Sequence, residues 1–230
     1  MRHGIKLDGW VITSDNSAGI GEKEMDAVEA PDQLTAKFAA RVALLEQWAA
    51  GSEPEAVLVH NFSGDLQWPA YMAGIAEVFQ EAEMEVPPID GSSETNMATL
   101  QSGIAVTMIG KQQRLFISEG LQWYVYGKPL VGKAVLEQKE AVADLKKIRT
   151  AIWSGLVERI WPAGSKGICA EARQLFGGNA AVSAAVDLRT SAGPACSVLL
   201  GVKEEHMQET ERFFDGNLVC LLVERAEGSV

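Results

Sequence analysis

The stretch "ARVALLEQWAAGSEPEAVLVHNF", residues 40–62, joins a helical pattern to a strand pattern through one tight turn. Its first half continues an apolar spacing of three and four residues that starts at Asp32, after a proline suited to a helix start. Gly51 opens a Gly-Ser-Glu-Pro turn, and "AVLVHNF" has the composition of a strand. The stretch therefore predicts a helix over 32–50, a turn, and a strand over 56–62.

The same alternation of strand and helix extends in both directions along the chain. A strand is expected over 5–14 and an amphipathic helix over 69–84. Further strands are expected at 103–110, 114–117, 121–127, 196–202 and 218–224, and further helices at 142–161, 169–176 and 206–214. Such alternation is typical of an α/β or α+β protein. The segment "GKPLVGK" indicates a boundary, which predicts two domains, 1–125 and 126–230.

The charge and the cysteine content exclude several classes of function. A net charge of −11 argues against nucleic acid and anionic membrane as partners, because both need a basic surface. Cys169, Cys196 and Cys220 lack metal-ligand spacing and are typical of free thiols in a reducing compartment. The sequence shows neither a membrane-spanning apolar run nor a signal-peptide pattern, so we expect a cytoplasmic protein. An acidic protein can still bind phosphate through divalent cations that its carboxylates hold.

Polar oxygen ligands recur where the expected strands and helices meet glycine turns. The stretch "TSDNSAGIGEKEMD" (13–26) carries Asp15, Gly19, Gly21 and Asp26 after a strand. Comparable positions are Glu46 before the Gly51 turn, Asn61 and Asp65 in "HNFSGD", and Ser93, Glu94 and Thr95 in "IDGSSETNM". Mg²⁺ takes a few carboxylates and completes its shell with water and phosphate oxygens. Each segment alone is explained as a loop, but together they predict a Mg²⁺–nucleotide site without a P-loop.

A second phosphate-binding pattern is incomplete. Residues 127–134, "GKPLVGKA", match G-x₄-G-K but place Ala134 where a P-loop needs the serine or threonine that binds Mg²⁺. The simpler interpretation is a glycine-containing linker that opens the second domain. The stretch "AGIG" (18–21) is too short for a dinucleotide fingerprint, because the third glycine and the acidic residue are missing.

Six segments together resemble a known family. "TSDNSAGIGEKEMDAV", "ARVALLEQWAAGSEPEAVLVHNF" and "GSSETNMATLQSGIAVTMIG" are similar to the N-terminal half of the aminoimidazole-ribonucleotide (AIR) synthase (PurM)-like superfamily, whose members are ATP-dependent. "YGKPLVGKAVLE", "PAGSKGICAEARQL" and "SAGPACSVLL" extend the resemblance into the second half and are similar to the alpha-ribazole kinase branch. That branch phosphorylates a nucleoside of the cobalamin lower ligand during salvage.

The resemblance implies a fold, a set of partners and a role for each candidate residue. The fold is a PurM-like two-lobed α/β fold, in which the N-terminal strands of a homodimer form a shared β-barrel and the C-terminal lobe is reduced. The activity is that of an ATP- and Mg²⁺-dependent kinase of a nucleoside-like substrate. The implied roles are metal binding for Asp15, Asp26, Glu46 and Glu94, phosphate contacts for Gly19, Gly21, Ser93 and Thr95, contact with nucleotide or acceptor for Asn61 and Lys166, and catalysis for Asp15 and Asp65. Relatives carry aspartate where this chain has Glu46 and, by the nearest replacement, Glu94.

Two alternatives and one aromatic segment stay open at this point. A dimer of the same fold would bind nucleotide without catalysis if the longer acids do not support turnover. Another ATP-dependent reaction, such as a ring closure of purine synthesis, would keep catalysis with a different substrate. The segment "LQWYVYG" (121–127), with Trp123, Tyr124 and Tyr126, either walls the base of the acceptor or packs in the core or a dimer interface.

Overall fold

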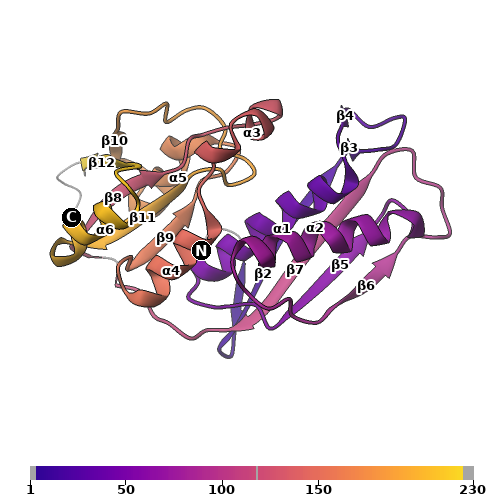
Figure 1. The fold of residues 1–230 in the computed structure, drawn as a ribbon, viewed down its shortest axis with the longest axis horizontal. Helices are drawn as coiled ribbons and strands as arrows, with labels where there is room; N and C mark the ends of the chain where they lie inside the picture. The colour runs from indigo at the N-terminus through magenta and orange to yellow at the C-terminus, as the bar shows by residue number, and fades with distance from the viewer. Residues whose placement is uncertain (1–3, 118, 225–230) are drawn as a thin grey trace. The chain divides into compact units, whose positions relative to one another are not determined.

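The computed structural model describes residues 4–117 and 119–224. The chain divides into two compact units, Met1–Leu115 and Phe116–Val230, and each contains a five-stranded sheet with helices (Figure 1). The boundary expected at residue 125 falls at the end of β8 (Leu121–Tyr126), a strand whose partners all belong to the second unit.

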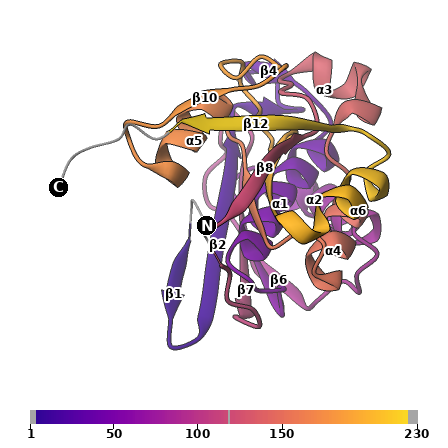
Figure 2. The ribbon, with the colours of Figure 1, turned by 90° about the vertical axis from the view of Figure 1, so that its left-hand side faces the viewer.

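The sheet of the first unit has mixed topology. Its strand order is β1 (Ile5–Leu7), β2 (Trp10–Ala18), β7 (Gly103–Lys111), β5 (Ala56–Asn61) and β6 (Ile89–Ser93). β5 and β6 are parallel, and the other neighbouring pairs are antiparallel. β1 and β2 form a hairpin (Figure 2), and its turn residues Asp8 and Gly9 have positive φ angles of 47° and 82°. A small parallel pair, β3 (Ile20–Gly21) and β4 (Val28–Glu29), follows β2 in the chain.

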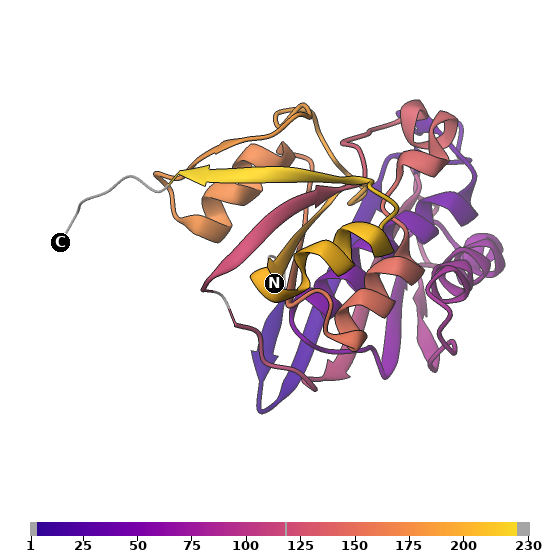
Figure 3. The same ribbon diagram turned by 60° about the vertical axis from the view of Figure 1, so that its left-hand side comes forward.

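Helices α1 (Asp32–Ala49) and α2 (Trp68–Glu81) cover one face of this sheet (Figures 1 and 3). The sheet residues beneath them alternate along each strand and are buried: Val11, Thr13, Val57, Val59, Ile104, Val106 and Met108. Thr13 Oγ1 donates a hydrogen bond of 2.8 Å to the carbonyl oxygen of Ala43 on α1. The small residues of α1 let the helix lie this close to the sheet.

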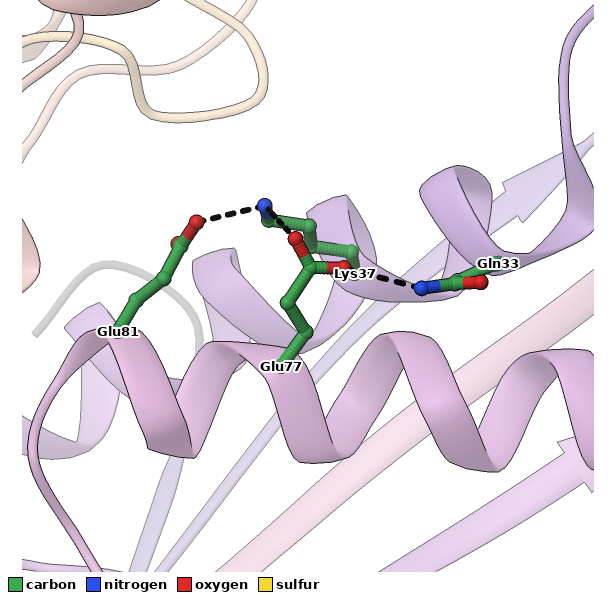
Figure 4. Close-up of polar contacts among 4 residues, drawn as sticks. All are labelled: Gln33, Lys37, Glu77 and Glu81. Atoms are coloured by element: carbon green, nitrogen blue, oxygen red, sulfur yellow. Dashed lines mark hydrogen bonds and ion pairs between the residues drawn. The ribbon is translucent and has the colours of Figure 1, made fainter.

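The two helices also contact each other through backbone and charge. Gly74 of α2 faces the backbone of α1 so closely that a Cβ there would overlap the carbonyl oxygen of Gln33. Lys37 Nζ lies 2.6 Å from both Glu77 Oε1 and Glu81 Oε1, and the amide of Gln33 donates to Glu77 (Figure 4). Partial burial alone would lower the pKa of Lys37, but these two carboxylates outweigh it and raise the pKa.

The sheet of the second unit is antiparallel throughout. Its order is β10 (Ala181–Ser183), β12 (Leu218–Glu224), β8, β11 (Val198–Lys203) and β9 (Arg159–Pro162). Helix α5 (Gly167–Phe176) lies on one face, and α4 (Leu145–Ser154) and α6 (Met207–Phe213) lie on the other (Figure 3). The shorter helical segments of the second unit are α3 (Lys133–Glu137), η2 (Lys139–Ala141) and η3 (Glu204–His206), and the first unit contains η1 (Asp65–Gln67).

Three expected elements differ from the structure. The single strand expected over 5–14 is two antiparallel strands, β1 and β2, joined by the turn at Asp8 and Gly9. Residues 114–117 form no strand, because the backbone amide of Arg114 donates to Gly51 and that of Ile117 to the Glu158 side chain instead of to a neighbouring strand. The helix expected over 142–161 ends at Ser154, where Gly155 adopts the left-handed conformation that terminates helices. Its expected last residues instead form β9. β6 is a strand where a loop was expected, and β10 lies in a segment for which the sequence predicted no element.

None of the helices within the described residues is long and apolar enough to cross a lipid bilayer.

Candidate functional site

The topology of the first sheet brings polar chain segments to one edge. β2, β5 and β6 end there and β7 begins there, because β7 is antiparallel to both β2 and β5 while β6 is parallel to β5. We name this region the polar edge and define it by residues 18–32, 61–65 and 93–103. It contains most of the residues that the sequence singles out.

Asn61 organises the loop at the end of β5. It is 1% exposed, and its Oδ1 accepts the backbone N–H of Ser63 at 2.8 Å. Its Nδ2 donates to the carbonyl of Gly64 at 2.7 Å and to Ser93 Oγ at 3.0 Å. The backbone amide of Glu94 donates to the Asn61 carbonyl. Both amide protons are therefore used within the protein, which makes Asn61 a structural link between β5 and β6.

Ser63 and Tyr71 form a second link that sequence reasoning missed. Tyr71 on α2 is fully buried, and its hydroxyl lies 2.6 Å from Ser63 Oγ. The backbone amide of Gly103 donates to the same Ser63 oxygen at 2.9 Å. Burial raises the pKa of Tyr71 to about 12, so the phenol stays neutral at physiological pH. The pair joins α2, the β5 loop and the start of β7.

The segment after β2 is tied to the segment before β7. Gly19, at φ 69°, donates its backbone amide to the Ser102 carbonyl at 2.8 Å. Asp26 Oδ1 accepts the amide of Ser102 at 2.7 Å, and its Oδ2 accepts the amide of Lys23 at 2.9 Å. Burial alone would raise the pKa of Asp26, but these hydrogen bonds outweigh it and lower the pKa. Lys23 Nζ reaches Thr99 Oγ1 at 2.6 Å, so Asp26 and Lys23 hold the two segments together.

Glu94, Thr95 and Asp65 line the outer part of the polar edge. Glu94 Oε1 accepts the backbone amides of Asn96 and Met97 at 2.7 and 3.1 Å, which closes the turn after β6. Thr95 and Asp65 are exposed, and Asp65 begins η1. These three residues are accessible to a ligand.

Asp15 lies in β2 opposite Val106 and is half-buried. Two strands, β7 and β5, separate it from β6. Neighbouring strands are ~4.8 Å apart, so Asp15 and Glu94 are about 14 Å apart across the sheet. One ion cannot contact both carboxylates.

Glu46 lies away from the polar edge. It is fully buried on α1, next to Gln47, whose Nε2 donates to the carbonyls of Val11 at 3.0 Å and Met108 at 2.8 Å. Val11 and Met108 lie toward the ends of β2 and β7 that are remote from the polar edge. The four expected metal ligands are thus spread over the first unit, and the described residues contain no group of three His, Cys, Asp or Glu side chains that could hold a metal ion. The helical spacing of the sequence predicts which face of α1 carries a side chain. It does not predict which end of the sheet that side chain lies against.

The aromatic segment of β8 does not form one wall. Trp123 points toward α5 and packs edge-to-face on Phe176, with ring centroids 5.2 Å apart. Tyr126 points to the opposite face and packs on Phe214 at 4.6 Å, and Tyr124 bonds to Glu211 of α6. All three rings are buried. Successive strand residues point to opposite faces, which gives these rings a core role.

Two further segments of the second unit were singled out by the sequence. Lys166 is exposed and directly precedes α5. The near-P-loop at 127–134 leads into α3, which has five residues. A P-loop needs a helix whose N-terminus faces the phosphates, so this segment is a connection between β8 and α3 within the second unit.

Solved structures share this arrangement along almost the whole chain. Hydrogenase maturation protein HypE in complex with ATP aligns over 97% of this chain and 79% of its own, with a TM-score of 0.67 and 12% identity. Thiamine monophosphate kinase from Aquifex aeolicus aligns over 97% of this chain and 87% of its own, with a TM-score of 0.66 and 12% identity. The chain has an AIR synthase-like fold. PurL from T. maritima complexed with AMPPCP aligns over 96% of this chain and 41% of its own, with a TM-score of 0.61 and 12% identity.

The fold class expected from the sequence, a PurM-like mixed α/β fold, is therefore confirmed. No protein-family model and no curated protein matches the sequence. At 12% identity the likeness concerns the fold, and the activity has to be argued from this chain's own residues.

Proposed function

We propose that this protein is an ATP- and Mg²⁺-dependent kinase of a small nucleoside-like molecule. The convergence of segments at the polar edge carries the proposal, because it gathers carboxylates, hydroxyls and a left-handed glycine at the ends of neighbouring strands. The AIR synthase-like fold adds support, since a HypE structure of that fold contains ATP and a thiamine monophosphate kinase structure contains AMPPCP. Gly19, Ser93 and Thr95 would contact the phosphates.

Mg²⁺ fits the donor chemistry of this edge. A nucleotide-bound Mg²⁺ usually takes one or two protein carboxylates and completes its octahedron with phosphate oxygens and water. Glu94 at the end of β6 and Asp15 in β2 would therefore serve separately, since they are too far apart to share an ion. Bound with ATP, Mg²⁺ neutralises charge on the phosphates during transfer. We propose no metal role for Glu46, which is buried on α1, or for Asp26, whose carboxylate oxygens accept two backbone amides of the loop.

The proposed acceptor is the 5′-hydroxyl of alpha-ribazole, which takes the γ-phosphoryl group of ATP. This assignment rests on the sequence resemblance to the alpha-ribazole kinase branch. Asp65 is exposed at the polar edge and would orient the hydroxyl. Phosphoryl transfer through a loose transition state needs little activation of the nucleophile, so one carboxylate suffices. Lys166 remains a proposed phosphate or substrate contact from the second unit.

One observation favours a second candidate, a protein of this fold that binds nucleotide without turnover. Glu94 and Glu46 both stand where relatives carry aspartate. In this structure Glu94 Oε1 closes a backbone turn, and Glu46 is buried far from the polar edge. Both acids therefore have placements that stabilise the fold without catalysis.

The test is product formation. The protein is incubated with ATP, Mg²⁺ and alpha-ribazole, with thiamine monophosphate and common nucleosides as control acceptors. Mass spectrometry should detect alpha-ribazole 5′-phosphate and ADP in equal amounts, and EDTA should abolish both. Lys133→Ala should retain turnover, because its near-P-loop segment is a linker. Phosphorylation of a control acceptor alone would assign another substrate, and metal-dependent ATP binding without product would favour the non-catalytic candidate.

We further propose that a second copy of this chain covers the outer face of the first sheet. The face opposite α1 and α2 carries apolar side chains that are exposed: Ile5 at 63%, Leu7 at 59%, Trp10 at 37% and Leu58 at 39%. A two-chain barrel, as the family resemblance implies, would bury this face. Exposed apolar patches of this kind typically mark interaction sites.

Leu58→Asp is expected to convert the dimer into a monomer, because it places a charge in the middle of the buried face. Size-exclusion chromatography with light scattering should give twice the chain mass for the wild type and the mass of one chain for the variant. Leu66→Asp is the matched control, since Leu66 is 91% exposed and lies outside the sheet. A wild type that stays monomeric at micromolar concentration would contradict the proposed barrel.

A further inference from the structure

Two buried oxygen atoms at the polar edge lack a well-formed hydrogen bond. Asp32 is 1% exposed and Ser102 is 2% exposed, and neither Asp32 Oδ1 nor Ser102 Oγ has a partner at good hydrogen-bond geometry. The Ser102 hydroxyl lies near the Asp26 carboxylate, whose pKa it helps to lower, and the Asp32 carboxyl receives the backbone amide of Glu22. Leaving a buried polar atom without a partner destabilises the folded state, and more so when the group is charged. Native proteins rarely keep such atoms unless a ligand, an ion or water satisfies them.

Both oxygens converge on Gly21. A Cβ built on Gly21 would lie 2.7 Å from Asp32 Oδ1 and would overlap Ser102 Oγ. Gly21 is not among the glycines with positive φ. Glycine is therefore required here by the close approach of the two oxygens and not by the backbone conformation. A carboxylate oxygen and a hydroxyl oxygen thus share one point above its Cα.

The charges around this point are negative. Glu22 and Asp26 are the acidic neighbours of the Asp32 carboxyl, and Lys23 is the basic one. Burial, followed by the charge of Glu22, raises the pKa of Asp32. Lys23 is itself held by Thr99. Three carboxylates and one ammonium leave two negative charges, although Glu22 is exposed and Asp26 and Lys23 are half-buried. Only the Asp32 carboxyl is buried, and a buried charge is normally paired or bound to a metal.

We propose that Asp32 Oδ1 and Ser102 Oγ bind a hard divalent cation, Mg²⁺ or Ca²⁺, above Gly21. Carboxylate and hydroxyl oxygens are the ligands that such ions take, and water completes their shells. The ion joins the start of α1 to the residue before β7, and Asp26 already ties that same residue to the loop after β2. It stiffens the polar edge and needs no nucleotide, so the site is independent of the proposed kinase activity.

Thermal unfolding of nucleotide-free protein at pH 7.5 tests this site. After removal of metals with EDTA, millimolar Mg²⁺ or Ca²⁺ should raise the unfolding midpoint by about 3 °C or more, because an ion that binds only the folded state stabilises it. Asp32→Asn and Ser102→Ala should each remove most of that rise. Glu94→Gln should keep it, because Glu94 lies in the separate nucleotide site. Sodium and potassium chloride at equal ionic strength serve as controls.

A second test compares the stability of the wild type and of Asp32→Asn in EDTA and with the ion. Without the ion, Asp32→Asn should be at least as stable as the wild type, since it removes a buried charge that lies beside the charges of Glu22 and Asp26. With Mg²⁺ or Ca²⁺ the wild type should be the more stable protein. A wild-type midpoint that neither divalent ion shifts beyond the salt controls overturns the proposal. An Asp32→Asn or Ser102→Ala variant that responds as strongly as the wild type overturns it as well.

Discussion

Gly74→Ala is expected to lower the free energy of unfolding of the first unit by about 2 kcal/mol, although alanine is the better helix former. The helix-propensity gain amounts to about 1 kcal/mol. Against it stands steric overlap, because the added Cβ would meet the carbonyl oxygen of Gln33 and lie 3.0 Å from the backbone nitrogen of Lys37. These atoms belong to the backbone of α1 and cannot rotate away. The two helices must therefore move apart, and overpacking of this kind costs about 1–3 kcal/mol or more.

Urea unfolding followed by tryptophan fluorescence measures this effect. Gly178→Ala is the matched control, since nothing lies within 4 Å of a Cβ at that position and its φ is not in the left-handed region. The control should change stability by less than about 0.5 kcal/mol. A Gly74→Ala protein as stable as the wild type would show that α1 and α2 are farther apart than the structure places them.

The elements predicted best from the sequence are those that local pattern determines. The helix at 32–49 was predicted almost to the residue, because its apolar spacing and its proline-preceded start are local signals. Strand β6 was missed because Gly91 and two serines are typical of a loop. In the structure a Cβ at Gly91 would overlap the backbone of Val59 in the neighbouring strand. Glycine is thus there for close strand pairing, which depends on a partner distant in sequence.

For the candidate site, the sequence likewise predicted the features that depend on local pattern and not those that depend on the order of the strands. That polar residues follow strands is a local pattern, and it identified Asn61, Asp65 and Glu94 as residues of one edge. Which acids meet depends on sheet order, so the separation of Asp15 from Glu94 could not be inferred. Asp32 and Ser102 carry no local signal beyond a helix start and a loop serine. Their shared point exists only because Gly21 brings the two segments together.

Glu94→Gln is expected to reduce ATP turnover by at least about 100-fold, equivalent to roughly 2.7 kcal/mol of transition-state stabilisation. The substitution keeps a carbonyl-type oxygen that can accept the backbone amides of Asn96 and Met97, so the turn after β6 should persist. It removes the negative charge that would hold Mg²⁺ against the phosphates. Turnover is measured with ATP and the acceptor found for the wild type, and the unfolding midpoint should stay within about 2 °C.

The metal dependence of ATP binding separates the proposed role of Glu94 from a merely structural one. Calorimetry should show weaker binding of ATP to Glu94→Gln than to the wild type when Mg²⁺ is present, and equal binding when EDTA removes the ion. A lost turn would weaken binding in both conditions, whereas a lost metal ligand acts only in the first. Glu85→Gln makes the same charge change at an exposed position between α2 and β6 and should alter neither measurement. If Glu94→Gln keeps wild-type turnover, its carboxylate only closes the turn after β6, and Asp15 is left as the proposed Mg²⁺ ligand at the edge.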